Sequence, residues 1–155
     1  GDELYSDGVA SDRRQRIAAY AVLTDIRDRV LLVKASPEDS GRWFLPGGGV
    51  RFGEDPEAGL RREVEEETGQ IVADLELTGV LSDVSQHKGT GLHSIRLIYR
   101  ATLAEERPLC NEAPGGSTVE VRWVPLERVA DLDTAPFVLL ALEVDRPSRL
   151  HLGQD

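Results

Sequence analysis

The sequence predicts an α/β domain in which helices flank a mixed β-sheet. Segments rich in β-branched and aliphatic residues alternate with segments of helical character, and this order favours helices layered on a sheet. The chain has 155 residues, which is close to the commonest size of a single domain. We therefore expect one domain over 15–155, preceded by a flexible N-terminal segment over 1–14 that shows no periodicity.

The first part of the domain is predicted to begin with two strands. Residues 15–24 and 29–35 are dominated by β-branched and aliphatic side chains, and the turn-like residues 25–28 separate them. A polar loop over 36–41 and a short apolar segment over 42–45 follow. These segments are the expected start of the sheet.

A glycine run then leads into the helix with the clearest boundaries. Residues 46–49 read Pro-Gly-Gly-Gly, and such a run lets the backbone approach a ligand closely. Asp55 is a good N-cap, Pro56 suits the first helical position, and Gly69 can end the helix. Gly59 in the helix interior is unfavourable unless something packs closely there, and we expect the glycine run to do so.

The second half is expected to complete the sheet and add helices. Residues 82–91 are polar, and we predict a loop there. The other predicted elements are, in order, strands over 71–81, 92–103 and 119–124 and helices over 125–132 and 134–144.

Charge and composition exclude several classes of function. The net charge is −10, which argues against binding polymeric nucleic acid through a basic surface. No apolar run approaches the roughly 20 residues that cross a bilayer, so we expect no membrane partner. The first sixteen residues lack the apolar stretch of a secretory signal, and the single cysteine, Cys110, forms no intrachain disulfide. A cytoplasmic location is the resulting expectation.

The predicted helix places three carboxylates on one face. Glu63, Glu66 and Glu67 stand at i, i+3 and i+4, within an arc of roughly 100°. Leu60 and Val64 lie beside that arc and predict packing of the helix onto the sheet. The acidic face is therefore expected to border the buried face.

Such an acidic face suits a divalent cation. Like charges at this spacing repel each other by about 0.2–0.5 kcal/mol even in water. Residues 54–67 hold seven acidic residues and two basic ones, a local charge of 2 − 7 = −5, so a bare polyphosphate would be repelled. Hard cations such as Mg²⁺ (or Mn²⁺) prefer oxygen ligands and reverse that sign. We interpret the segment as a metal-bridged phosphate site.

The spacing around this helix resembles the signature of a known family. Gly48 is followed after five residues by Glu54, and after seven more by Arg62-Glu63-Val64-Glu65-Glu66-Glu67-Thr68-Gly69. This pattern over 48–70 resembles the signature of Nudix hydrolases, with Gln70 where the family usually has an aliphatic residue. The resemblance implies an α/β/α sandwich around a mixed sheet. It also implies hydrolysis of a nucleoside diphosphate linked to a moiety X.

The resemblance also implies roles for individual residues. Glu63, Glu66 and Glu67 match the metal ligands, with the Gly47 carbonyl as an addition, and one of the glutamates orients or deprotonates water. Arg62 and Glu54 match a pair in which the arginine fixes the orientation of the glutamates.

Several residues outside the helix are further candidates. Glu120 is an extra ligand or base by analogy with relatives that carry a downstream glutamate, against the equal alternative of an exposed strand residue. Glu112 in the adjacent loop is its rival. Gly48, Arg51 and His87 are candidates for binding the substrate, because they lie in or beside expected loops.

The function expected from these observations is metal-dependent hydrolysis of a pyrophosphate bond. The partner would be a small nucleotide-like molecule, either a nucleoside triphosphate or a nucleotide sugar, and a homodimer is left open. One alternative is a nucleotide-sensing module that keeps the fold without turnover, although the three intact glutamates speak against it. Another is a protein-interaction domain whose acidic helix is only a solvated face.

Overall fold

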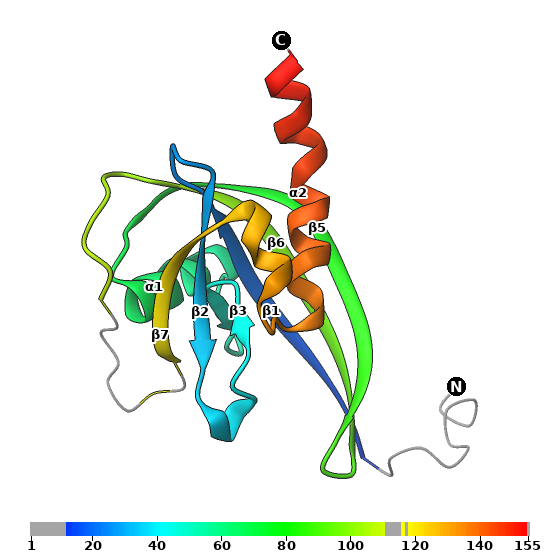
Figure 1. Cartoon of the computed structure of the whole chain (residues 1–155). Helices are drawn as coiled ribbons and strands as arrows, with labels where there is room; N and C mark the ends of the chain where they lie inside the picture. Colours follow the sequence, from blue (N-terminus) through cyan, green and yellow to red (C-terminus); the bar gives the residue numbers. More distant parts are fainter. Residues whose placement is uncertain (1–11, 111–115, 117, 155) are drawn as a thin grey trace.

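The chain folds into two β-sheets with a helix packed on either side (Figure 1). The computed structural model describes residues 12–110, 116 and 118–154. Its strands are β1 (Asp12–Leu23), β2 (Arg29–Ala35), β3 (Trp43–Phe44), β4 (Gly47–Gly49), β5 (Val72–His87), β6 (Thr90–Leu103) and β7 (Thr118–Pro125). Its helices are η2 (Pro37–Asp39), α1 (Pro56–Thr68), η3 (Leu126–Asp131) and α2 (Pro136–Gln154), of which η2 and η3 are 3₁₀ turns.

Strand β1 is the centre of the larger sheet. The strand order is β4-β1-β6-β5 in the four-stranded sheet and β3-β2-β7 in the three-stranded one. β1 runs parallel to β6 along its whole length and antiparallel to β4. The larger sheet is therefore mixed, as expected, and the second sheet is antiparallel.

Alternate residues of β1 contribute to two separate cores. Ala18, Tyr20 and Val22 belong to one hydrophobic cluster, whereas Ala19, Ala21 and Leu23 belong to the other. Because successive strand residues point to opposite faces, the two clusters lie on opposite sides of the sheet. α2 packs into the first cluster and α1 into the second, and Figure 1 shows α1 behind the strands and α2 in front. The predicted α/β/α sandwich is confirmed.

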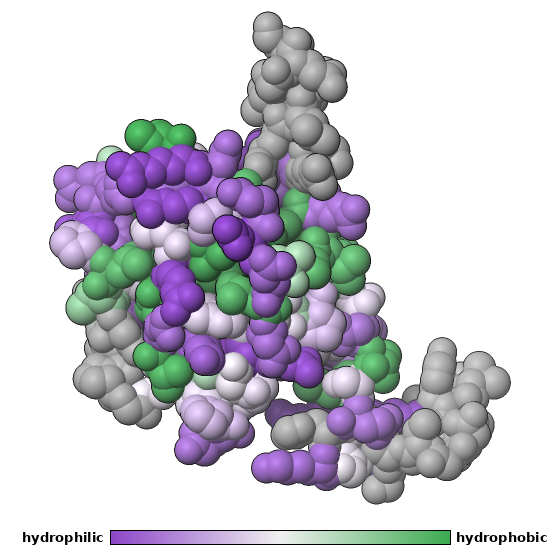
Figure 2. All heavy atoms as spheres, in the orientation of Figure 1, coloured by the Kyte–Doolittle hydropathy of each residue, from purple (hydrophilic) through white to green (hydrophobic). Residues whose placement is uncertain are grey.

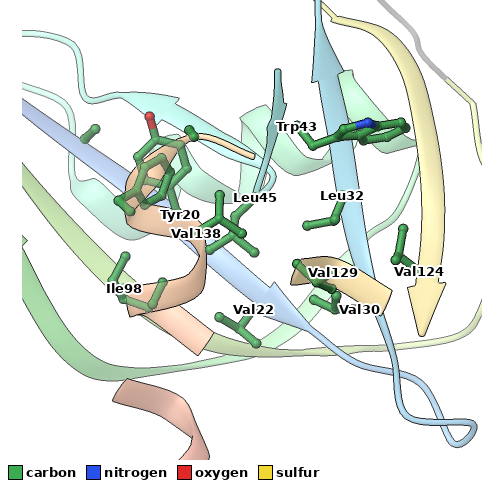
Figure 3. Packing of buried hydrophobic residues seen from close by; sticks show 14 residues of the cluster. Tyr20, Val22, Val30, Leu32, Trp43, Leu45, Ile98, Val124, Val129 and Val138 are labelled. Atoms are coloured by element: carbon green, nitrogen blue, oxygen red, sulfur yellow. The ribbon is translucent and has the colours of Figure 1, made fainter. Parts of the chain in front are cut away.

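The cluster under α2 joins the two sheets. Figure 3 shows Val138 of α2 beside Tyr20 of β1 and Leu45. Phe137 also packs on Tyr20, with ring centroids 4.5 Å apart. Trp43 of β3 is buried in the same cluster, so this aromatic residue belongs to the core.

Helix α1 begins and ends where its sequence predicts. The side chain of Asp55 accepts a hydrogen bond from the Ala58 N–H at 3.1 Å and caps the N-terminus. Gly69 closes the helix in the left-handed conformation, at φ 77°. Leu60 and Val64 are buried against β1 and β6 in the second cluster. This packing fixes which face of α1 is turned toward the glycines of β4.

The predicted loop over 82–91 is wrong. β5 continues to His87 and β6 starts at Thr90, so only Lys88 and Gly89 turn the chain, both with positive φ. Cross-strand pairing stabilises this polar hairpin, including an ion pair between Asp83 and Arg96 at 2.5 Å. Such pairing joins distant residues, and a local polar pattern does not reveal it.

The ends of the chain differ from expectation in smaller ways. Residues 12–14, expected within a flexible segment, form the start of β1, and 1–11 lie outside the described residues. The helix predicted over 134–144 extends to Gln154. The short helix predicted over 125–132 is the 3₁₀ turn η3.

The visible surface carries mostly hydrophilic residues. Figure 2 shows them surrounding scattered hydrophobic ones. Among the described helices, none combines the length and the apolar character needed to cross a membrane.

The packing of α1 leads to a stability test. We expect Leu60→Ala to lower the free energy of unfolding by roughly 2–5 kcal/mol, because it leaves a cavity in a well-packed core; Leu60 is 1% exposed. Glu57→Ala on the exposed side of the same helix is the control and should stay within about 0.5 kcal/mol. Urea denaturation of both variants measures the difference. Equal stability of the two variants would contradict this packing role of α1.

Candidate active site

The acidic face of α1 meets the glycines of β4 at a cavity. Glu67 accepts a hydrogen bond from the Gly47 N–H at 2.8 Å. Glu63 lies against Gly48, where an added methyl group would come within 3.3 Å of the Glu63 Oε1 atom. Both glutamates line a cavity of about 320 Å³, together with Tyr20, Phe44, Thr118 and other residues. Two of the three predicted glutamates thus line one open cavity.

Gly47 occupies a position that tolerates no side chain. Its φ is 139°, and a Cβ atom there would lie 2.1 Å from the Ala19 carbonyl oxygen. The flanking hydrogen bonds between β1 and β4 run from Ala21 N–H to Pro46 O and from Val50 N–H to Ile17 O. Because antiparallel pairs alternate in steps of two, the Gly47 N–H points away from β1. It is therefore free to reach Glu67.

Burial and crowding raise the proton affinity of two glutamates. The pKa of Glu67 is raised to about 8, chiefly by burial and further by the charges of Glu63 and Glu66, against the opposing hydrogen bonds from Gly47 and Thr118. The pKa of Glu63 is also raised by burial, although Arg62 opposes that shift. In the metal-free protein, the environment of both carboxyl groups therefore favours their protonated, uncharged form.

Arg62 connects the acidic face to the loop before α1. Its Nε and Nη2 atoms donate to the two oxygens of Glu54 at 3.2 and 3.3 Å. Its Nη1 atom lies 3.4 Å from Glu63 Oε1 and 3.5 Å from Glu66 Oε2. The Arg51 N–H also donates to Glu54 and, with Arg62, lowers the pKa of that carboxyl. One guanidinium therefore orients three carboxylates.

Gly59 packs against a different partner from the one expected. A methyl group on Gly59 would lie 2.7 Å from the Glu54 Oε1 atom. The close approach therefore comes from the Glu54 side chain, and the prediction that the glycine run packs there is wrong. Gly59 leaves room for the carboxylate that Arg62 holds.

Thr118 is a site residue that the sequence did not reveal. Its hydroxyl donates to Glu67 Oε2 at 3.5 Å. The register of β7 against β2 shifts between Lys34, which pairs with Glu120, and Ala35, which pairs with Thr118. This β-bulge turns Thr118 toward the cavity that Ala35 also lines. No sequence pattern marks a bulge of this kind.

Glu120 lies on the other face of β7. It pairs with Lys34, and adjacent residues of β2 point to opposite faces. Its carboxylate forms an ion pair with Arg122, whose guanidinium stacks on Trp43 at 5.0 Å. The structure therefore does not bring Glu120 to the carboxylates of α1. Its rival Glu112 lies outside the described residues.

The structure places the three candidate substrate-binding residues in different parts of the fold. Gly48 lines the cavity of Glu63 and Glu67, and Arg51 lies in the loop between β4 and α1. His87 is at the tip of the β5–β6 hairpin, at the bottom of Figure 1. Its backbone pairs with Thr90, which pairs with the first residue of β1, so its backbone is remote from the part of β1 beside β4. Its side chain is not described.

The chemistry of the acidic face fits a divalent cation. Glu63, Glu66 and Glu67 supply only oxygen donors, which Mg²⁺ and Mn²⁺ prefer, and the raised pKa of Glu67 shows that its surroundings disfavour its charged form. Within the described residues, no three acidic, His or Cys side chains are close enough together to hold an ion as they stand. Glu63 and Glu66 are turned toward Arg62, so shared coordination requires them to release it.

Gln70, the departure from the family pattern, is accommodated by hydrogen bonds. Its side chain is fully buried, yet its Nε2 donates to the Arg107 carbonyl at 2.8 Å and its Oε1 accepts from the Arg107 N–H at 3.1 Å. A buried amide with such partners avoids most of the desolvation cost. Gln70 thus ties the end of α1 to the chain after β6.

Comparison with known proteins identifies related sequences and structures. A family model described as the NUDIX domain matches residues 14–141. A Mycobacterium tuberculosis protein named "Putative 8-oxo-dGTP diphosphatase 2" is 38% identical over 102 residues, which cover 62% of this chain and 72% of that protein. A Streptomyces rubellomurinus protein named "CMP-5'-(N-acetyl-N-hydroxy-3-aminopropyl)phosphonate hydrolase" is 32% identical over 124 residues, or 74% of this chain and 54% of its own length. The crystal structure of a MutT NUDIX hydrolase from Burkholderia pseudomallei superposes with a TM-score of 0.71 at 27% identity, covering 84% of this chain and 97% of that one.

The raised pKa of Glu67 predicts how stability depends on pH in the absence of metal. The folded protein keeps the proton to about pH 8, whereas the unfolded chain loses it near the ordinary value of 4.5. The folded state therefore binds more protons between these values, and stability falls as pH rises through that window and levels off above it. We expect Glu67→Gln to remove this fall.

Thermal denaturation in EDTA at pH 5 and pH 8 measures the effect. Glu67→Gln should raise Tm relative to the wild type at pH 8 and have a smaller effect at pH 5, and about 1 kcal/mol corresponds to roughly 2–4 °C in a chain of this size. Glu57→Gln, on the exposed side of α1, should follow the wild type. If Tm of all three proteins changed with pH in parallel, the pKa of Glu67 would not be raised by folding.

Proposed function

The chain belongs to the Nudix hydrolase family, and we propose that it hydrolyses a pyrophosphate bond of a nucleotide-like substrate with the help of a divalent cation. The observation that supports this proposal is the acidic face of α1 turned toward β4. There Glu63 and Glu67 share a cavity whose wall includes Gly47 and Gly48. An anionic substrate can approach so acidic a surface only if cations compensate the charge.

We assign the cation to the glutamates of α1. Glu63, Glu66 and Glu67 are the proposed ligands of Mg²⁺ or Mn²⁺, and the Gly47 carbonyl is a further oxygen in the same place. When bound, such a cation neutralises phosphate oxygens and acidifies water. As the oxygen of water bonds to phosphorus, the bond from that phosphorus to the bridging oxygen breaks and its electron pair leaves with the departing phosphate. The proton of the attacking water goes to one of these three carboxylates.

The residues around the glutamates act as positioning groups. Arg62, held by Glu54 through two hydrogen bonds, restricts the side chains of Glu63 and Glu66. Thr118 and the Gly47 N–H do the same for Glu67. Side chains with fixed orientation lose less entropy on binding, and their partners matter almost as much as the ligands themselves.

The proposed substrate is a nucleoside triphosphate or a nucleotide sugar. The names of the relatives in M. tuberculosis and S. rubellomurinus refer to a nucleoside triphosphate and to a CMP-linked phosphonate, and both molecules join a nucleotide to a further anionic group. The cavity of about 320 Å³ also has the aromatic side chains of Tyr20 and Phe44 in its lining. Aromatic rings of this kind suit a nucleobase or a sugar.

A substrate panel tests metal dependence and the cleaved bond together. Nucleoside triphosphates and nucleotide sugars are incubated with Mg²⁺ or Mn²⁺, and phosphate, pyrophosphate and nucleoside monophosphate are quantified. We expect release of nucleoside monophosphate from at least one substrate and complete loss of it in EDTA, because the acidic face then repels the substrate. Full turnover in EDTA would refute the metal-dependent mechanism.

Single substitutions on α1 test the assignment of the glutamates. We expect Glu66→Gln and Glu67→Gln each to lower kcat/KM by at least about 100-fold, equivalent to about 2.7 kcal/mol in the barrier, because each removes a charged oxygen ligand. Glu57→Gln removes a carboxylate from the exposed side of the same helix and should stay within about twofold of the wild type. Unchanged rates in both of the first two variants would defeat the assignment.

A further inference from the structure

A larger groove adjoins the acidic cavity where β4 ends. It measures about 940 Å³ and is bounded by the first half of β1, the loop over 50–56 and Leu92 of β6. Arg16 and Gly49 line both spaces. The two spaces are thus neighbours.

Positive charge collects in this groove although the chain as a whole is acidic. Its lining residues include Arg14, Arg16 and Arg51. In the part of the chain that the structure describes, none of these three guanidinium groups has a carboxylate within ion-pair distance. The one carboxylate in the lining, that of Glu54, is held by Arg62. Three positive charges without an ion pair among the described residues, gathered in a concave surface, attract an anion.

Arg16 of the groove and Glu63 of the acidic cavity lie beside consecutive residues of β4. An added methyl group would lie 3.3 Å from Glu63 Oε1 at Gly48 and 3.4 Å from the Arg16 Nη2 atom at Gly49. Consecutive Cα atoms are about 3.8 Å apart, so the carboxylate and the guanidinium contact neighbouring residues of β4.

In the proposed function, the cations that compensate the diphosphate are held by the acidic face of α1. The arginines are not needed for that task and are available to bind another part of the substrate. We propose that this arginine groove, defined by Arg14, Arg16 and Arg51, binds a negatively charged group of the moiety X. The inference rests on the proposed function and narrows its substrate class. It favours substrates whose moiety X is itself anionic, such as the terminal phosphate of a nucleoside triphosphate, over nucleotide sugars with an uncharged sugar.

Kinetics with two substrate classes test the groove. We expect Arg16→Gln and Arg51→Gln to raise KM for a nucleoside triphosphate by about tenfold, the equivalent of losing one charge-assisted contact, with a smaller change in kcat. KM for a nucleotide sugar with a neutral sugar should change by less than about twofold. Arg27→Gln is the matched control, because it removes the same charge from the exposed turn between β1 and β2. Equal effects of all three variants, or equal effects on both substrates, would overturn the inference.

Binding of inorganic tripolyphosphate tests the groove without a nucleotide. The protein is titrated by calorimetry at low ionic strength with Mg²⁺ present to compensate the charge of the acidic face, and circular dichroism shows that each variant is folded. Wild type and Arg27→Gln should bind the probe, and Arg16→Gln and Arg51→Gln should bind it about tenfold more weakly. No binding by the wild type, or equal binding by all four proteins, overturns the inference.

The two experiments separate this inference from the proposed function. If no nucleotide is hydrolysed, the proposed function fails, and the calorimetry still decides whether the groove binds anions. If turnover depends on Glu66 and Glu67 while the arginine variants behave like Arg27→Gln, the proposed function stands and the groove assignment fails.

Discussion

The close approach of like charges on α1 to the backbone of β4 is the constraint on which the rest of the structure depends. Glu67 is partly buried, accepts a hydrogen bond from the Gly47 N–H, and has Glu63 and Glu66 as acidic neighbours. This contact requires a residue without a side chain at Gly47, whose Cβ would collide with β1. It also requires the Arg62–Glu54 pair, which compensates part of the charge. Gly47 and the Arg62–Glu54 pair therefore both serve to accommodate the cluster of acidic residues on α1.

Apolar packing is strong enough to hold the charges together. Each exposed like-charge pair on a helix costs about 0.2–0.5 kcal/mol, whereas full burial of a Leu or Val side chain contributes about 1.5–3 kcal/mol. Leu60 and Val64 are both fully buried on the side of α1 next to the glutamates. The hydrophobic face of the helix therefore overcomes the repulsion and presses the acidic face against β4. The pKa of Glu67 is raised chiefly by burial and further by the charges of Glu63 and Glu66, and a bound cation would favour its charged form.

The sequence predicted correctly those features that depend on neighbouring residues in the chain, above all the bounds of α1. Asp55, Pro56 and Gly69 set the ends of α1, and the spacing of the glutamates set its acidic face. The parts that depend on pairing between distant segments were missed: the polar hairpin formed by β5 and β6, and the bulge that turns Thr118 toward Glu67. The partner of Gly59 was missed for the same reason, since Glu54 reaches it only through a turn before α1. The arginines of the groove are spread from β1 to the 50–56 loop, and only the fold brings them together.

Calorimetric titration of Mn²⁺ into the metal-free protein at pH 7, repeated in buffers with different ionisation enthalpies, tests the central claim most directly. A carboxyl with a pKa of about 8 is largely protonated at that pH, so binding of the cation at Glu67 should release close to one proton. The same titration of Glu67→Gln should show weaker binding and no such release. If the wild type does not bind Mn²⁺, or if both proteins bind it equally and without proton release, the acidic face of α1 is not a cation site.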